Sequence, residues 1–206
     1  MQDNGAPDPD REPPLRYIGK REGVRHVLHA AIRSVFYGED PFAIHLLGQS
    51  AEKVLLDLLK NAKIEDPFFS LLKPEMRSEF FEFYREPYNF LKHADRDSDG
   101  KLAVRNIVAS NDVPLYCCIH RYRVLFGSHT QHMGVFSMFV ETFYPKIVEL
   151  NPLPPMKKLV EATGSLTRGE LLNQIWSCWQ RDPTLQQERK EDLIDVANAN
   201  ASRRTA

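Results

Sequence analysis

The chain has 206 residues, of which 42% are hydrophobic and 27% charged, and its formal net charge is -1. This length and composition predict one compact domain, and the near-zero charge excludes a general electrostatic attraction to nucleic acid or anionic membranes. No run of about 18 apolar residues is present and the N-terminus is acidic and proline-rich, so we expect a cytoplasmic protein that does not contact a membrane.

The first part of the chain predicts a disordered leader followed by two amphipathic helices. Residues 1–18 carry four prolines and few apolar side chains, a composition that cannot offset the entropy cost of ordering. Apolar residues then recur at spacings of three and four, which predicts a helix over 22–38 that ends at a glycine. Asp40 and Pro41 are typical of the N-cap and first turn of a second helix, which the apolar pattern extends to about residue 61.

A strongly aromatic helix is predicted next. Pro74 opens it, and phenylalanine and tyrosine side chains cluster at 80–84. Pro87 removes one helical hydrogen bond and clashes with the preceding turn, so residues 87–94 form either a kinked continuation or a new short helix. The stretch 101–108 then forms a short strand or an irregular arm.

Two further helices complete the predicted core. One begins at Asn111 or Asp112, just before Pro114, and stops at Gly127. The next is capped by Ser128 with Gln131, in the spacing of a capping box, and ends before Pro145.

The C-terminal part predicts a linker and two helices. The proline-rich stretch 151–155 is typical of a semi-rigid linker. Thr167 and Glu170 form a capping box for a helix that carries Trp176 and Trp179, and a last helix covers 184–198. We therefore divide the chain into a disordered leader (1–18), a helical bundle domain (19–150), a linker with C-terminal helices (151–198) and a disordered tail (199–206).

The absence of period-two alternation and of any repeat of 20 to 50 residues predicts an all-α protein, an irregular helical bundle with a C-terminal helical extension. Cys117 and Cys118 are adjacent and Cys178 is distant, which fits neither a disulfide framework nor a zinc spacing. We expect these cysteines to be reduced and mostly buried.

The first candidate site is the polar face formed by Asn89, Lys92 and His93. Asn89 and His93 are four residues apart, so on a helix they project from one face, with Lys92 beside them. Metal-independent RNA cleavage needs a general base, a general acid and a cation, and His93 with Lys92 or Arg85 has these residue types. The alternative is structural: Asn89 and His93 bond the next loop and end the helix, where a cation is favoured.

The second candidate site is half of a calcium-binding loop. Asp95, Asp97, Asp99 and Gly100 stand where an EF-hand places its first three carboxylates and its glycine. Position twelve of that loop should be a bidentate glutamate, but it is Asn106. The alternative interpretation, a solvated charged turn, fits better because the second half of the loop is missing.

Other histidines form weaker patterns. His45 flanks the apolar stripe of the second helix and is able to join His93 in one pocket if the two helices pack together. The pairs His26 with His29 and His129 with His132 have a helical spacing that suits two metal ligands, but the sequence places no further ligand beside them. A structural or surface role is therefore favoured for both pairs.

Two sequence blocks carry a family resemblance. The stretches 40–60, with Ala43-Ile44-His45, and 88–97, with Asn89-Phe90-Leu91-Lys92-His93-Ala94-Asp95-Arg96-Asp97, resemble a family of bacterial all-helical proteins of uncharacterised function in which AIH and NFxKHADRD blocks recur. The resemblance covers roughly residues 25 to 145. It implies that His45 and the segment 89–97 belong to one shared unit.

More distantly, the Asn89 to His93 pattern resembles the helix motif of the HEPN superfamily, helical proteins that include metal-independent ribonucleases. In that motif an arginine precedes the polar residue, whereas Tyr88 stands there in this chain and seven residues separate Arg85 from His93. The resemblance therefore implies possible roles for Asn89 and His93 alone.

These patterns favour a non-catalytic interaction or regulatory module with a HEPN-like polar site. The alternatives are a metal-independent ribonuclease or RNA-binding protein of HEPN type and, third, a calcium-binding protein. We expect no cofactor. The stripe of Trp176 and Trp179 on the C-terminal helices suits a protein partner, and RNA is the other possible partner.

Overall fold

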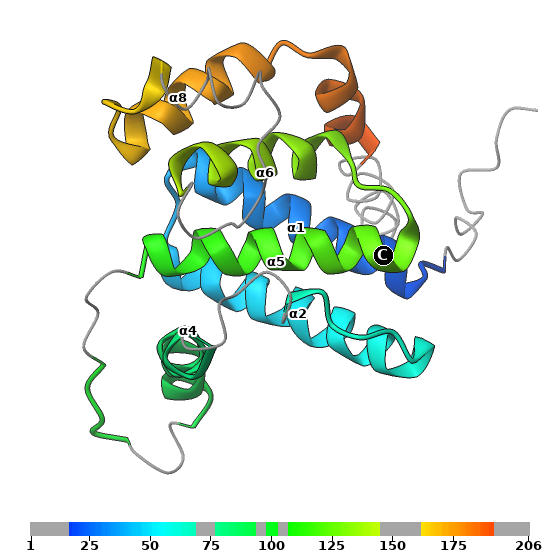
Figure 1. Cartoon of the computed structure of the whole chain (residues 1–206), viewed down its shortest axis with the longest axis vertical. Coiled ribbons are helices and arrows are strands. Elements are labelled where there is room, and N and C mark those ends of the chain that lie inside the picture. Colours follow the sequence, from blue (N-terminus) through cyan, green and yellow to red (C-terminus); the bar gives the residue numbers. More distant parts are fainter. Residues whose placement is uncertain (1–16, 69–76, 94–97, 103–106, 145–161, 192–206) are drawn as a thin grey trace, which may run out of the picture.

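The computed structural model describes residues 17–68, 77–93, 98–102, 107–144 and 162–191. Within these residues the secondary structure is helical and contains no strand, which confirms the predicted all-α class. Figure 1 shows the helices stacked as layers, with α4 at one end of the bundle and α8 at the other.

The first two helices confirm their predicted caps. α1 (Lys20–Tyr37) ends at Gly38, whose left-handed φ of 68° lets its cap N–H groups reach the carbonyls of the last turn. In α2 (Pro41–Ala62), the Asp40 side chain accepts hydrogen bonds from the backbone N–H groups of Phe42 and Ala43, at 2.9 and 3.0 Å. Local cap chemistry therefore fixes the sharp turn between these helices.

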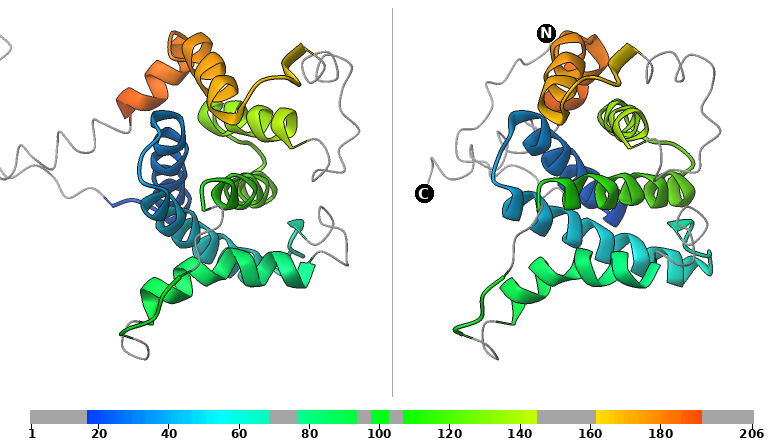
Figure 2. Two further views of the ribbon diagram at one scale, coloured as in Figure 1. Left: turned by 90° about the vertical axis from the view of Figure 1, so that its left-hand side faces the viewer. Right: turned by 60° about the vertical axis from the view of Figure 1, so that its left-hand side comes forward.

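Pro87 lies inside one helix, α4 (Arg77–Lys92), so residues 87–92 continue the aromatic helix rather than starting a new one. Tyr84 and Pro87 are buried, and α4 contacts both α2 and α5. Pro74 lies outside the described residues. Figure 2 shows α4 on the side of α2 that is remote from the C-terminal helices.

The start predicted for α5 (Ala109–Phe126) was wrong. The helix begins at Ala109, so Asn111 and Asp112 lie in its first turn and do not cap it, and Pro114 lies inside it. Their side chains are buried and bond other helices instead, and these tertiary contacts replace the local capping role that their residue types favour. The predicted stop at Gly127 is confirmed by its left-handed φ of 75°.

The predicted cap of α6 (Gln131–Phe143) was also wrong. The N-cap is Thr130, whose hydroxyl oxygen accepts a hydrogen bond from Met133 N–H, and not Ser128. The helix begins two residues later than a Ser128 cap implies because the chain still turns through 127–130 after leaving α5.

The C-terminal helices share the core of the bundle. The Thr167 and Glu170 capping box of α8 (Arg168–Trp179) is confirmed, and residues 183–191 are helical. The linker stretch 151–155 and the predicted helix end at 192–198 lie outside the described residues. Buried side chains of α8 and of 183–191 belong to the same apolar cluster as those of α1, α5 and α6: Leu171, Leu172, Ile175 and Leu185.

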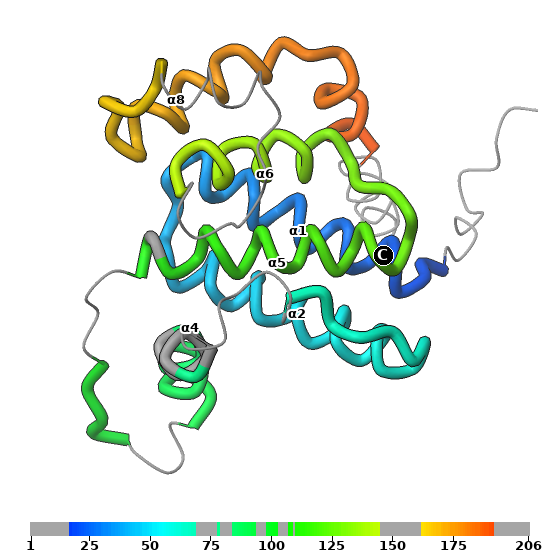
Figure 3. Tube along the Cα trace, in the orientation of Figure 1, coloured from blue at the N-terminus to red at the C-terminus, as the bar shows by residue number. Residues whose placement is uncertain are grey.

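The C-terminal helices pack back against α6 and α1, as the chain path in Figure 3 can be followed to show. α8 contacts α6 and α1, and the Trp176 ring stacks on Phe36 of α1 with ring centroids 5.1 Å apart. The described helices include none with the length and apolar character needed to cross a bilayer.

Candidate functional sites

The C-terminal end of α4 carries the polar face predicted from sequence. Asn89 and Lys92 are exposed and His93 is half-buried. The backbone N–H of His93 donates to the Asn89 carbonyl at 3.0 Å, so the helical path continues to His93 and the two residues are one turn apart. The Lys92 ammonium lies 5.6 Å from the centre of the Tyr88 ring, a cation–π contact.

His45 lies elsewhere, in the interior between α2 and α5. Its Nδ1 is 2.9 Å from Asn111 Oδ1, and the Asn111 amide donates in turn to the Pro41 carbonyl at 2.8 Å. The His45 ring meets the Tyr84 ring edge-on, with centroids 5.5 Å apart. His45 therefore contacts Asn111 of α5 and Tyr84 of α4, the helix that also carries Asn89 and Lys92. A shared pocket of His45 and His93 stays a prediction.

Burial lowers the pKa of the His45 imidazole, and the hydrogen bonds with Asn111 and with the Tyr84 backbone only partly oppose this shift. The neutral ring is therefore favoured. Its Nε2 is buried and forms no hydrogen bond of good geometry within the described residues. The same is true of the amide nitrogen of Gln49, one turn further along α2.

A buried ionic cluster adjoins this layer. Arg121 of α5 is 1% exposed and donates to Glu52 of α2 and, through two nitrogens, to Asp66. Cys117 and Cys118 are buried close by and form no disulfide, and the Cys118 thiol donates to the Gly48 carbonyl at 3.9 Å. Burial raises the pKa of both thiols, to about 12 for Cys118. Raised pKa values keep these thiols protonated and unreactive, so this layer is structural in character.

The calcium-loop candidate is only partly within the described residues. Asp99 is exposed, whereas Asp95 and Asp97 lie outside the described residues together with Arg96. Calcium binding by this loop therefore stays a prediction.

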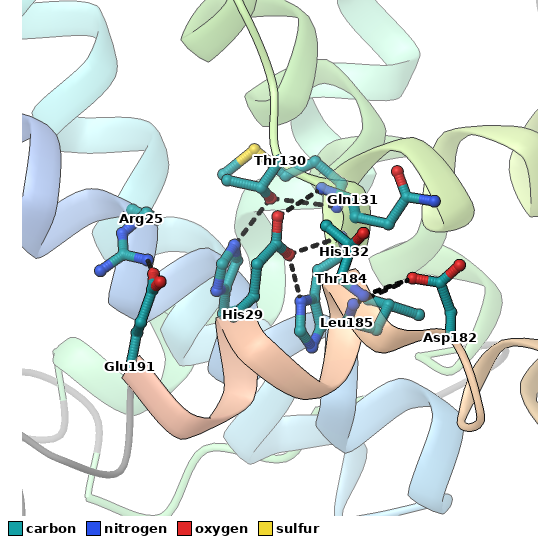
Figure 4. A network of polar contacts seen from close by, with 11 residues as sticks. Arg25, His29, Thr130, Gln131, His132, Asp182, Thr184, Leu185 and Glu191 are labelled. Carbon is teal, nitrogen blue, oxygen red and sulfur yellow. Dashed lines mark hydrogen bonds and ion pairs between the residues drawn. The ribbon is translucent and has the colours of Figure 1, made fainter.

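A third group of polar side chains joins α1, α6 and the helical residues 183–191. His29 Nε2 lies 2.7 Å from the Thr130 hydroxyl oxygen, and His132 Nδ1 lies 2.7 Å from Glu188 Oε2. The two imidazole rings stack with centroids 4.6 Å apart and an angle of 25° between their planes. Figure 4 shows the His29 and His132 rings side by side beneath Thr130.

Glu188 is held in place by the N-terminus of α6. Its carboxylate accepts hydrogen bonds from the backbone N–H groups of Gln131, at 2.8 Å, and His132, at 3.1 Å. Burial acts to raise the pKa of Glu188, but the hydrogen bonds from His132 and from these two N–H groups outweigh it, so the pKa is lowered. The ionised carboxylate is the favoured form.

The sequence analysis considered His29 and His132 in two separate local pairs, with a structural or surface role favoured, and did not predict the contact between them. Within each predicted pair one member is buried, His29 or His132, and the other, His26 or His129, lies nearer the surface. The buried members meet across helices, and Glu188 joins them, which no local spacing indicates. The available signal was that His29 falls in the apolar stripe of α1, beside Leu28 and one turn before Ile32.

A second buried ion pair fixes α8. Arg168 donates to both carboxylate oxygens of Asp112 at 2.7 Å, and the Tyr144 hydroxyl donates to Asp112 Oδ2 at 2.9 Å. Asp112 is fully buried. Because a bidentate pair of this kind holds both partners in one orientation, it ties the first turn of α8 to the first turn of α5.

Comparison with models of known protein families gave no match. No curated protein and no solved structure matched the chain either.

Proposed function

We propose that this protein is a non-catalytic interaction or regulatory module that binds a protein partner through the C-terminal end of α4. The observation that supports this role is the exposure of four consecutive residues, 89–92. Consecutive residues of an α-helix point in directions about 100° apart, so each side of this end of α4 presents a partly exposed side chain.

The exposed residues have the chemistry of a binding surface. Phe90 is 37% exposed and Leu91 40% exposed, although both are large and apolar. Asn89 and Lys92 lie beside them and supply a donor-rich polar rim. An aromatic anchor within a polar rim is typical of protein interfaces, and Lys92 favours a partner that presents apolar side chains next to a carboxylate.

The C-terminal tryptophans are less suited to this role. Trp176 stacks on Phe36 and meets Tyr37 edge-on, with centroids 5.4 Å apart, and Trp179 packs against the same apolar core. Side chains engaged inside the bundle have less surface to offer a partner.

A metal-independent ribonuclease or RNA-binding protein of HEPN type is the second candidate. It is favoured by the one-turn spacing of Asn89 and His93 at the helix end, with the Lys92 cation next to them. Support for catalysis is weaker because His45, the second histidine expected at this site, is buried against Asn111.

A photo-cross-linking experiment tests the interaction surface. A benzoyl-phenylalanine is placed at Phe90 in one preparation and at Val124 in another, because Val124 is equally apolar and 44% exposed on α5. We expect a discrete cross-linked partner in cells from position 90 only, lost when Leu91→Asp or Lys92→Glu is added. Equal cross-linking from both positions, or none from position 90, contradicts the proposal.

An RNA assay separates the second candidate from the first. Labelled single-stranded RNA is incubated with the wild-type protein and with His93→Ala, in the presence of a chelator. Cleavage by the wild type that disappears in His93→Ala supports the ribonuclease and excludes a purely non-catalytic role. RNA that stays intact in both samples and forms no complex with the wild-type protein leaves the interaction module as the supported function.

A further inference from the structure

The cluster at the junction of α1, α6 and residues 183–191 has the donor atoms of a metal site. His29, His132 and Glu188 each offer one ligand atom, and these atoms all lie within 4.8 Å of one another. Two imidazoles and a carboxylate are a donor set found in protein zinc sites. We propose that His29, His132 and Glu188 bind one divalent transition-metal ion, with Zn²⁺ as its representative.

The burial of these side chains separates the cluster from an ordinary charged surface. His29 is 0% and His132 2% exposed, and the Glu188 side chain is 15% exposed. Surface acidic groups attract cations weakly because water competes for them, whereas buried ligands face less competition. The partial exposure of Glu188 leaves a route for the ion to enter.

The ligands are oriented in advance by groups around them. The Glu188 carboxylate is fixed by the Gln131 and His132 backbone N–H groups, and the Thr130 hydroxyl holds His29. Such outer contacts are what orient ligands in known metal sites. A water molecule is available as the fourth ligand.

Only a small adjustment is needed to take up the ion. Ligand atoms of a tetrahedral zinc site with bonds of about 2.0 Å lie about 3.3 Å apart. The 2.7 Å contact between His132 Nδ1 and Glu188 must therefore open slightly, and the longer separations must close. If Nδ1 becomes the ligand, the proton that it donates to Glu188 moves to Nε2 of the same ring or to solvent.

The chemistry of the donors selects the class of ion. Imidazole nitrogen suits Zn²⁺, Co²⁺ and Ni²⁺, whereas Mg²⁺ and Ca²⁺ require oxygen ligands throughout. The ligands come from three segments that are far apart in the sequence, so the ion ties residues 183–191 to α1 and α6. Metal binding is thus a means of controlling how firmly the C-terminal helical segment is held on the bundle.

The test uses the full chain after treatment with a chelator, titrated with Co²⁺, whose visible spectrum reports its coordination geometry. We expect one Co²⁺ ion to bind per chain, with a spectrum typical of tetrahedral coordination. Added Zn²⁺ should displace the Co²⁺ ion. Zn²⁺ at about 100 times its Kd should raise the Tm by roughly 5–10 °C. His29→Gln and Glu188→Gln should each weaken binding by at least about tenfold.

Two matched controls show whether binding belongs to this cluster. His129→Gln changes the exposed histidine three residues before His132, and Glu191→Gln changes an exposed carboxylate three residues after Glu188. Both should leave the Co²⁺ affinity unchanged.

The proposal is overturned if the wild type forms no stoichiometric Co²⁺ complex. It is also overturned if Glu188→Gln binds as tightly as Glu191→Gln. This comparison decides the matter even where His29→Gln does not fold, since Glu188 is the most exposed of the three ligands.

Discussion

Arg121 binds Asp66 through two parallel hydrogen bonds, from Nε at 2.9 Å and from Nη2 at 2.8 Å, while its third nitrogen reaches Glu52 at 2.9 Å. The guanidinium also lies 5.1 Å from the centre of the Phe68 ring. One almost fully buried cation therefore joins α2, α5 and the segment that follows α2.

Replacing Arg121 should strongly destabilise the fold. Arg121→Met keeps most of the side-chain volume but leaves the Glu52 carboxylate, 5% exposed, without its cation. Loss of one partner from a buried ion pair costs about 3–5 kcal/mol in the free energy of unfolding, which urea denaturation measures. Adding Glu52→Gln should recover part of the loss, because Asp66 is then the one carboxylate of this cluster left without its cation.

A matched surface pair provides the control. Lys53 and Asp57, also on α2, form an ion pair at 2.9 Å with side chains 75% and 56% exposed. Lys53→Met should change the free energy of unfolding by less than about 0.5 kcal/mol. Equal effects of Arg121→Met and Lys53→Met would show that burial does not set the strength of these pairs.

The pair of Arg168 and Asp112 predicts a pH-dependent effect. Burial raises the pKa of the Asp112 carboxyl, while the hydrogen bonds and charge of Arg168 and the Tyr144 hydroxyl limit the rise. In Arg168→Met the pKa of Asp112 should rise further. An acid with a raised folded-state pKa contributes stability at low pH that is lost as the pH rises through that pKa. Arg168→Met should therefore cost about 3 kcal/mol near neutral pH and less on acidification.

Urea unfolding at about pH 7 and about pH 5 measures this dependence. Tyr144→Phe is the control, since it removes one hydrogen bond and no charge and should cost only about 1 kcal/mol. A loss in Arg168→Met that is the same at both pH values would mean that Asp112 is not the source of the effect.

The sequence predicts those parts of the fold that local chemistry decides. Asp40, Gly38 and the Thr167–Glu170 box act within one turn of their own helix, and the structure has them in those roles. Asn111 and Asp112 look like caps in the sequence, but their side chains bond His45 and Arg168. Partners that are more than 50 residues away leave no mark in the local pattern.

The same limit applies to the candidate sites. The Asn89 to His93 face was predictable because a helical turn alone sets its spacing. The meeting of His29, His132 and Glu188 depends on the packing of three helices, and helix packing is decided by apolar contacts spread along the whole chain. A histidine within an apolar stripe is a sign of a buried polar partner but does not identify it.

His45 should make the fold less stable in mild acid. Burial lowers its pKa below the ordinary value of 6.5, against the hydrogen bonds with Asn111 and the Tyr84 backbone. The unfolded chain then binds the proton more tightly, so stability is complete above about pH 6.5 and falls as the pH drops towards the folded-state pKa. His45→Gln, which keeps a hydrogen-bonding group near Asn111, should reduce this slope by up to about 1.4 kcal/mol per pH unit.

Denaturant titrations between about pH 7 and about pH 5 measure the slope of stability against pH. Part of the slope should remain in His45→Gln, because burial, with the nearby charges of Arg123 and His129, lowers the pKa of His120 to about 4. The double change with His120→Gln should therefore have the smallest slope. Equal slopes in the wild type and His45→Gln would mean that His45 binds its proton equally well in both states.

The packing of Trp176 on Phe36 predicts that α8 supports the first helix as well as itself. Trp176→Ala removes a stacked, partly buried ring and should cost about 2–3 kcal/mol, below the range for fully buried aromatic residues. Because Phe36 loses its partner, amide hydrogen exchange should quicken in the last turns of α1 as well as in α8. Trp179→Ala, in the same helix, is the control, since no ring contact joins Trp179 to α1 within the described residues. Faster exchange in α8 alone would mean that the C-terminal helices are an independent appendage.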